Sequence, residues 1–408
     1  MGRFADALGL FSGAGRGCGT TLVGWQENIS ELALTRSPHS DDRNTGLDLL
    51  RALAIVLTFF VHFLWIIGAW VYQRDFESLS IRDAKGFLEG VVIWLYHSQH
   101  GVFLFFVLSG FLMGRKWFSA HPPAVGTYLR DRAWRTLPGA WLAVTAALGL
   151  MYLAGRVPSE PLRLWVENLF FLNWFRKIDT EHVLVVTWSL HAEWLFYLAL
   201  PVVAWVARRW GKSHWIVVAI ASVALAGAVK FLSVRGAAYV LFFAAGVIAA
   251  IEQKRLRGAV DSIPWIVVLL LYIGVNGVYG WFSPTAAKLQ TALWNPFDTH
   301  AIAFAFTATL LLLKIVDAPF GQGRWVRLGR YIGKISYSVY LWHLLVLLAL
   351  GHWLGWPSAL AAQPSVGAVG FYATSCVLLT WAVSALSFRW IEQPYFARRE
   401  RQKIRNAS

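Results

Sequence analysis

An arginine and a histidine lie inside a long apolar segment near the start of the chain, LDLLRALAIVLTFFVHFLW. Arg51 and His62 are 11 residues apart, so on an α-helix they lie within about 20° of the same face and roughly 16 Å apart along the axis. Ionisable side chains in such a segment are costly and indicate function. A cation and a deeper imidazole on one face suit a substrate with a charged handle and a reactive end. An interfacial arginine and a structural histidine would explain the pair equally well.

The segment TWSLHAEWLFYLALP places a carboxyl group in apolar surroundings. Ser189, Glu193 and Tyr197 recur at i, i+4 and i+8 and therefore share one helix face. A glutamate in such a segment needs a polar partner or a bound proton. It could orient a histidine or act itself as an acid or base, and a structural glutamate paired with an arginine is the alternative.

A third segment, KISYSVYLWHLLVLL, carries Ser336, Tyr340 and His343 on one helix face, at i, i+4 and i+7. A helix that begins near Lys334 would place His343 near the middle of the bilayer. These side chains could line a substrate site, and a hydrogen-bond network between helices is the alternative.

Arginines are the candidates for binding a phosphorylated ligand. Arg132 and Arg135, in YLRDRAWRTLPGAW, share a face if the segment is helical, and Arg115 ends the apolar run GVFLFFVLSGFLMGR. Planar guanidinium groups suit two-pronged binding of phosphate. Ordinary positive charge at a membrane surface would explain the same residues without a ligand.

Two other features of the second apolar stretch need less explanation. His97 and His100 lie one turn apart and could hold a metal ion, but no third ligand is near, so we predict no metal site. Small residues that would allow close helix packing follow them: Gly101, Ser109, Gly110 and Gly114.

The composition identifies the medium that these elements occupy. Of the 408 residues, 57% are hydrophobic and only 14% are charged, whereas a soluble domain carries charge on about a quarter of its positions. The formal charge of +15 is spread in short clusters between apolar runs, which is typical of membrane-protein loops near anionic lipid. We therefore predict contact with the bilayer and no nucleic-acid partner.

Stretches long enough to cross roughly 30 Å of hydrocarbon occur ten times, and backbone groups in lipid must pair within each segment, as in a helix. We predict an all-α fold with ten transmembrane helices. A weaker stretch at 163–176 fits an eleventh crossing or an interfacial half-helix, and we keep ten. The predicted spans are 47–72, 91–114, 137–155, 187–207, 214–231, 237–252, 263–282, 300–316, 334–355 and 367–390.

The distribution of basic residues predicts the orientation. With ten spans both termini lie on one side, which then holds 27 of the 37 Lys and Arg residues, so that side is cytoplasmic. We predict three parts: a polar, disordered cytoplasmic lead at 1–43, a transmembrane domain at 44–396, and a basic cytoplasmic tail at 397–408.

The ordered set of segments resembles the acyltransferase-3 family of membrane-bound acyltransferases. The matching pieces are GLDLLRALAIVLTFFVH, GVFLFFVLSGFLMGR, RAWRTLPGAW, TWSLHAEWLFY, ISYSVYLWHLLV and IEQPYF. The resemblance implies a multi-pass protein of the bacterial cytoplasmic membrane. It also implies transfer of an acyl group, usually acetyl, from acyl-coenzyme A to a hydroxyl of a carbohydrate or lipid-linked glycan, with no permanently bound cofactor.

Residue by residue, the family's Arg and His signature matches Arg51 and His62, its RxxR motif matches Arg132 and Arg135, and its glutamate matches Glu193. Our hypothesis places coenzyme A phosphates on these arginines and Arg115. His62 then acts as the base for the acceptor hydroxyl, with Glu193 orienting it. Direct transfer and an acyl-histidine intermediate both fit.

A secondary transporter or exporter of a glycan or small metabolite is the rival interpretation, because buried Arg, His and Glu also form relays in transporters. The enzyme predicts that purified protein releases coenzyme A from acetyl-coenzyme A when a glycan acceptor is supplied. Vectorial uptake into vesicles without that release would favour the transporter instead.

Overall fold

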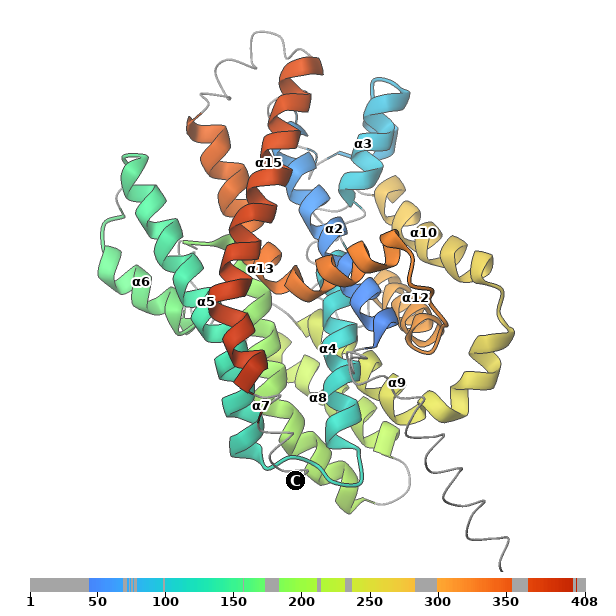
Figure 1. Cartoon of the computed structure of the whole chain (residues 1–408). Coiled ribbons are helices and arrows are strands. Elements are labelled where there is room, and N and C mark those ends of the chain that lie inside the picture. Colours follow the sequence, from blue (N-terminus) through green and yellow to red (C-terminus); the bar gives the residue numbers. More distant parts are fainter. Residues whose placement is uncertain are drawn as a thin grey trace, which may run out of the picture. The chain divides into compact units, whose positions relative to one another are not determined.

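The computed structural model describes residues 44–68, 72, 74, 76, 79–97, 100–156, 158–172, 183–210, 214–231, 237–282, 299–353, 366–398 and 401. The predicted lead at 1–43 lies outside these residues, as does most of the predicted tail at 397–408. Throughout the described part, the regular elements are helices (Figure 1). The all-α prediction is therefore confirmed for these residues.

The described α-helices occur in the following order along the chain: α2 (Thr45–Ile67), α3 (Phe87–His97), α4 (Gly101–Trp117), α5 (Val125–Leu153), α6 (Pro161–Leu169), α7 (Trp188–Arg209), α8 (His214–Phe231), α9 (Ala237–Ser262), α10 (Trp265–Phe282), α12 (Thr299–Val316), α13 (Arg324–Trp353) and α15 (Val366–Ser387). Two 3-10 turns, η2 (Ile81–Asp83) and η4 (Val185–Thr187), and a π-helical turn, η6 (Phe388–Glu392), complete the described elements.

Within the residues that the structure describes, six helical segments are long and apolar enough to cross a membrane by themselves: Thr45–Ile67, Phe87–Trp117, Val125–Leu153, Val185–Arg209, Arg324–His352 and Gly367–Arg398. A bent pair, Tyr239–Ser262 with Trp265–Val275, can count as a seventh. The apolar parts of α8 and α12, His214–Gly227 and Ala301–Val316, are shorter. The chain is a multi-pass membrane protein, but the count of ten spans is not confirmed, and the cytoplasmic position of both termini stays a prediction.

The bend between α9 and α10 explains part of the difference. The two helices meet at 102°, where Pro264 precedes α10 and has no backbone N–H to continue a helix. The last turns of α9 carry Arg255 and Arg257, whose side chains are 79% and 59% exposed. A hydropathy pattern shows two apolar runs here, but it does not show the angle at which they join.

The structure also distinguishes the two interpretations of the weaker stretch at 163–176, of which it describes residues 163–172. There α6 is nine residues long, and a helix that crosses the hydrocarbon needs about 20 residues. The chain turns directly after it, at Phe171, whose φ is +59°. Of the two interpretations, the half-helix fits and the eleventh crossing does not.

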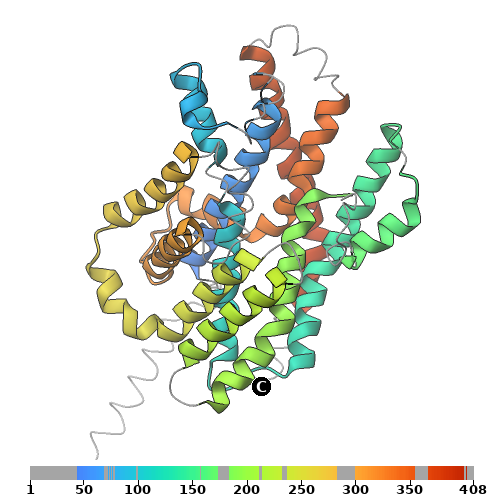
Figure 2. The same cartoon turned by 180° about the vertical axis from the view of Figure 1, so that it is seen from behind.

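Close backbone contacts hold the centre of the bundle together. Both views place α4 between α2 and the group formed by α7, α8 and α9 (Figures 1 and 2). A Cβ atom on Gly110 would lie 2.1 Å from the Phe243 carbonyl oxygen, and one on Gly246 would lie 2.0 Å from the Val107 oxygen. Gly101 and Gly114 also face neighbouring helices closely, so the prediction of close packing is confirmed for these glycines.

The contact between α4 and α9 predicts a pair of unequal substitutions. Gly246→Ala places a methyl group against the α4 backbone and should lower the stability by about 1–3 kcal/mol through overpacking. Gly258→Ala, on the same helix, meets nothing within 4 Å and should be neutral or stabilising by up to about 1 kcal/mol. Thermal unfolding of the two variants in detergent measures the difference. Equal melting temperatures would contradict the close contact.

Candidate active site

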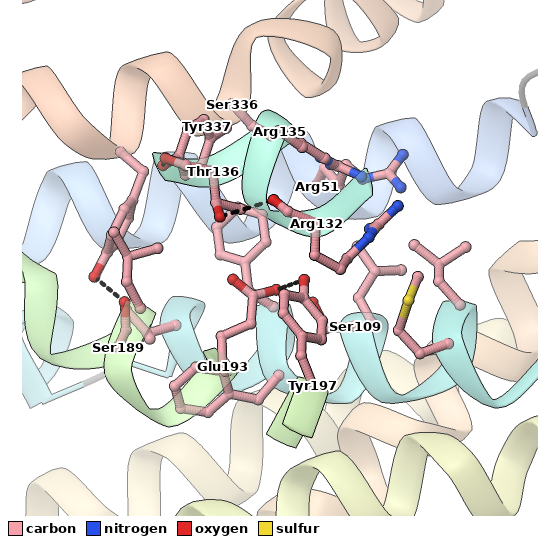
Figure 3. Close-up of a pocket in the computed structure, with 18 residues that line it drawn as sticks. Arg51, Ser109, Arg132, Arg135, Thr136, Ser189, Glu193, Tyr197, Ser336 and Tyr337 are labelled. Atoms are coloured by element: carbon pink, nitrogen blue, oxygen red, sulfur yellow. Dashed lines mark hydrogen bonds between the residues drawn. The ribbon is translucent and has the colours of Figure 1, made fainter. Parts of the chain in front are cut away.

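Five helices contribute to a cavity of about 90 Å³ in the bundle. Its walls come from α2, α4, α5, α7 and α13 (Figure 3). Eight of the eleven residues that the sequence nominated line it: Arg51, Arg132, Arg135, Ser189, Glu193, Tyr197, Ser336 and Tyr340. Segments from four predicted helix faces thus meet around one space.

Arg132 is the most deeply buried cation of this cavity. It is 2% exposed, and its guanidinium carbon lies 5.8 Å from the centre of the Tyr197 ring. Its Nε bonds no partner, and no carboxylate forms an ion pair with it among the described residues. A buried charge costs several kcal/mol unless it is paired, so this guanidinium is suited to hold an anion.

The two other arginines differ from Arg132 in their surroundings. Arg51 donates to Asp48, with Nη1 2.6 Å from the carboxylate oxygen. Arg135 is half-buried, and its guanidinium carbon lies 6.0 Å from the centre of the Phe396 ring. The cavity therefore gathers three guanidinium groups, of which one has a carboxylate partner in the described part of the chain.

Glu193 is held by two hydroxyl groups. Its Oε1 accepts hydrogen bonds from Ser109 Oγ at 2.7 Å and from Tyr197 OH at 2.5 Å (Figure 3). Ser109 comes from α4 and Tyr197 from the next turn of α7. The alternative of a structural Glu–Arg ion pair is not what the described residues show. A carboxylate held in this way offsets part of the positive charge of the arginines without forming an ion pair with any one of them among the described residues.

A second hydrogen-bonded group lines the side of the cavity formed by α7 and α13. Tyr340 OH lies 2.6 Å from Ser189 Oγ and donates to the Val186 carbonyl oxygen at 2.6 Å. Ser336 turns to its own helix, where Oγ donates to the Gly333 oxygen at 3.0 Å. The Tyr340 contacts fit the alternative of a hydrogen-bond network between helices, whereas the Ser336 contact stays within α13.

Three polar lining residues are not among the predicted site residues: Ser109, Thr136 and Tyr337. Tyr337 OH donates to the Thr136 carbonyl oxygen at 2.5 Å and so joins α13 to α5. Thr136 lies four residues after Arg132, so the helix spacing that paired Arg132 with Arg135 also reaches it. For Ser109 the sequence predicts only close helix packing, and nothing in its own segment indicates a glutamate partner.

His62 and His343 lie apart from this group and form a pair of their own. His343 Nε2 is 3.1 Å from His62 Nδ1, with the ring centres 4.9 Å apart. The expected contact between Glu193 and His62 does not occur among the described hydrogen bonds and ion pairs, because α7 presents Glu193 to Ser109 and the arginines. Tyr340 connects the two groups, since its ring centre lies 5.9 Å from that of His343.

Arg115 is the remaining nominated residue, and it does not line the cavity. It is exposed at the end of α4, with its guanidinium carbon 5.7 Å from the centre of the Phe111 ring. Its predicted role in binding coenzyme A therefore stays a prediction without support from the cavity geometry.

The apolar helices and the cavity lined by arginines, a glutamate and hydroxyl groups together define a membrane-embedded protein with a candidate active site. Residues 44–385 match the acyltransferase domain of the acyltransferase-3 type. The chain belongs to this acyltransferase family, as its motifs predicted.

Relatives that span most of the chain come from several bacteria. Nodulation protein 10 of Rhizobium leguminosarum bv. viciae is 25% identical over 393 residues, 87% of this chain and 94% of that protein. The exopolysaccharide production protein ExoZ of Rhizobium meliloti (strain 1021) is 31% identical over 282 residues, 64% of this chain and 82% of that protein. The putative peptidoglycan O-acetyltransferase YrhL of Bacillus subtilis (strain 168) is 23% identical over 86% of this chain and 54% of its own length. No solved structure matches the chain.

Proposed function

We propose that this protein is an O-acyltransferase of the bacterial cytoplasmic membrane that transfers an acyl group, in the first instance acetyl, from acyl-coenzyme A to a hydroxyl of a carbohydrate or lipid-linked glycan. Membership of the acyltransferase family supports the reaction class. The printed descriptions of exopolysaccharide and peptidoglycan relatives support a glycan acceptor. The observation that carries the donor assignment is the buried Arg132 in a cavity with Arg51 and Arg135.

The donor side of the proposal follows from charge. Phosphate groups form strong, two-pronged hydrogen bonds with guanidinium groups, and Arg132 offers such a group inside the bundle. Arg51, near the N-terminal end of α2, lines the same cavity as Arg132. His62 lies 11 residues further along α2, roughly 16 Å along its axis. An extended donor held by its phosphates at Arg51 and Arg132 would direct its thioester along α2 toward His62.

The acceptor side follows from proton chemistry. A sugar hydroxyl is far too weak an acid to ionise near neutral pH, so a base must remove its proton as the new bond forms. In the proposed step His62 takes that proton, the hydroxyl oxygen bonds to the thioester carbon, and the carbon–sulfur bond breaks. The leaving thiolate recovers the proton and departs as coenzyme A. Glu193 is assigned to the donor end, where it fixes the Tyr197 and Ser109 hydroxyls beside the arginines.

The transporter alternative has one structural feature in its favour, the bent pair α9–α10. Broken helices in transporters lie near mid-membrane and form the substrate site. Here the bend follows the exposed residues Arg255 and Arg257. Among the described side chains of α9 and α10, none lines the cavity that holds Arg132 and Glu193. Family membership and the position of the bend therefore both favour the enzyme.

The donor assignment predicts a binding defect. Arg132→Met keeps a long apolar stem in the helix but removes the charge, and it should weaken acetyl-coenzyme A binding about 10- to 100-fold, the worth of a hydrogen-bonded charge. Arg209→Met serves as the control, because Arg209 is exposed and lies over Trp205, away from the cavity. Equilibrium binding of radiolabelled acetyl-coenzyme A to the purified protein gives both constants. Equal affinity in the two variants would remove Arg132 from the donor site.

The base assignment predicts a chemical defect. His62→Ala should lower acyl transfer by about 10²- to 10⁴-fold, as expected for loss of a general base, while the helices stay intact. Glu193→Gln keeps the hydrogen-bond acceptor but loses the charge and should also impair transfer. Polysaccharide from a deletion strain complemented with each variant, analysed by mass spectrometry for the acyl mass, gives the result. Full acylation with His62→Ala would refute the proposal.

A further inference from the structure

The histidine pair lies where α2 and α13 pack together. His343 is fully buried, at 0% exposure, and the rings of Phe59 and Tyr340 lie 6.3 and 5.9 Å from its ring, centre to centre. His62 is half-buried beside it. No carboxylate bonds either imidazole among the residues that the structure describes. Whatever orients His62 must therefore be found within this pair and its backbone neighbours.

The backbone contacts fix which nitrogen of each ring carries a proton. His343 Nδ1 lies 3.0 Å from the Val339 oxygen and 2.8 Å from the Tyr340 oxygen. A carbonyl oxygen only accepts, so Nδ1 of His343 must hold the hydrogen, and Nε2 of the neutral ring then carries a lone pair. The proton assignment follows from the partners and not from the sequence.

The same reasoning applies to the second ring. His62 Nδ1 lies 3.0 Å from the Thr58 oxygen, so it also carries a hydrogen. That hydrogen is shared between the Thr58 oxygen and His343 Nε2, which is 3.1 Å away. The lone pair of neutral His62 is then on Nε2, and within the described part of the chain no group bonds that atom.

We propose that His343 is the positioning residue of the reaction, accepting the Nδ1 hydrogen of His62 so that Nε2 is the nitrogen that takes the acceptor's proton. This inference rests on the proposed role of His62 as the base. In hydrolase triads a carboxylate fixes the tautomer and the ring orientation of the catalytic histidine. Here the neutral imidazole of His343 has that role toward His62. When His62 gains its proton, the hydrogen bonds from Nδ1 strengthen, because a charged donor binds its acceptors more tightly.

Two amide substitutions separate this role from simple packing. His343→Asn can place its amide near the former Nδ1 and reach the backbone carbonyls, but it leaves no acceptor near the former Nε2. His343→Gln can place its amide oxygen close to the former Nε2 and accept from His62. We expect Asn to lower kcat about 100-fold, within the range for a disturbed general base, and Gln to retain most of kcat. Neither substitution should change the KM for acetyl-coenzyme A by more than about twofold, because the arginines are untouched.

The measurement uses the full chain in lipid nanodiscs, acetyl-coenzyme A as the donor and polysaccharide from a deletion strain as the acceptor. His352→Asn is the matched control, since His352 is an exposed histidine on the same helix, and its kcat should equal that of the unmodified protein. In a His62→Ala background, His343→Asn should cause no further loss, because the two side chains act as one unit.

The outcomes distinguish this inference from the function on which it rests. Equal losses with Asn and Gln, at melting temperatures equal to that of the unmodified protein, would overturn the acceptor role of His343. Unchanged kcat in both variants, with His62→Ala inactive, would overturn it as well and leave the proposed function standing. An active His62→Ala protein would refute the proposed function itself.

Discussion

A guanidinium group that is buried inside a membrane protein constrains everything around it. Arg132 sits on α5 at 2% exposure, and the surrounding helices must supply polar groups without consuming its charge. Tyr197 provides a ring face, while Ser109 and Tyr197 hold Glu193 as a nearby carboxylate. The polar sides of α4, α5, α7 and α13 must therefore face inward at one level, which in turn fixes how these helices are rotated. This arrangement stabilises a cavity with charged side chains inside an otherwise apolar protein.

The spacing of residues within single helices was enough to predict most of the cavity. Ser189 and Glu193 share a face with Tyr197, and Arg132 shares one with Arg135, because residues three or four apart are neighbours on a helix. All five line the same space. Such spacing also relates Arg51 to His62, but it gives only their common face. Arg51 lines the cavity and His62 does not appear among its walls, because the helix carries the two to different depths.

Contacts between helices were not predictable in the same way. The expectation that Glu193 orients His62 required the relative rotation and height of α2 and α7, which no pattern within either segment contains. The structure instead gives His62 a partner from α13, 281 positions away in the chain. The count of ten spans is not confirmed, for a related reason. Hydropathy measures how apolar a segment is, but the angle between α9 and α10 depends on Pro264 and the polar turns before it.

Where α2 and α13 pack together, the close contact between the two backbones affects the position of a charged residue. A Cβ atom on Gly333 would lie 2.0 Å from the Asp48 carbonyl oxygen, and the Asp48 carboxylate is the partner of Arg51. Any side chain at Gly333 would press on the residue that holds this cation, although Gly333 itself carries no polar side chain. A natural variant at this glycine would consequently resemble an active-site lesion in an activity assay, and only a structural readout would reveal its origin in helix packing.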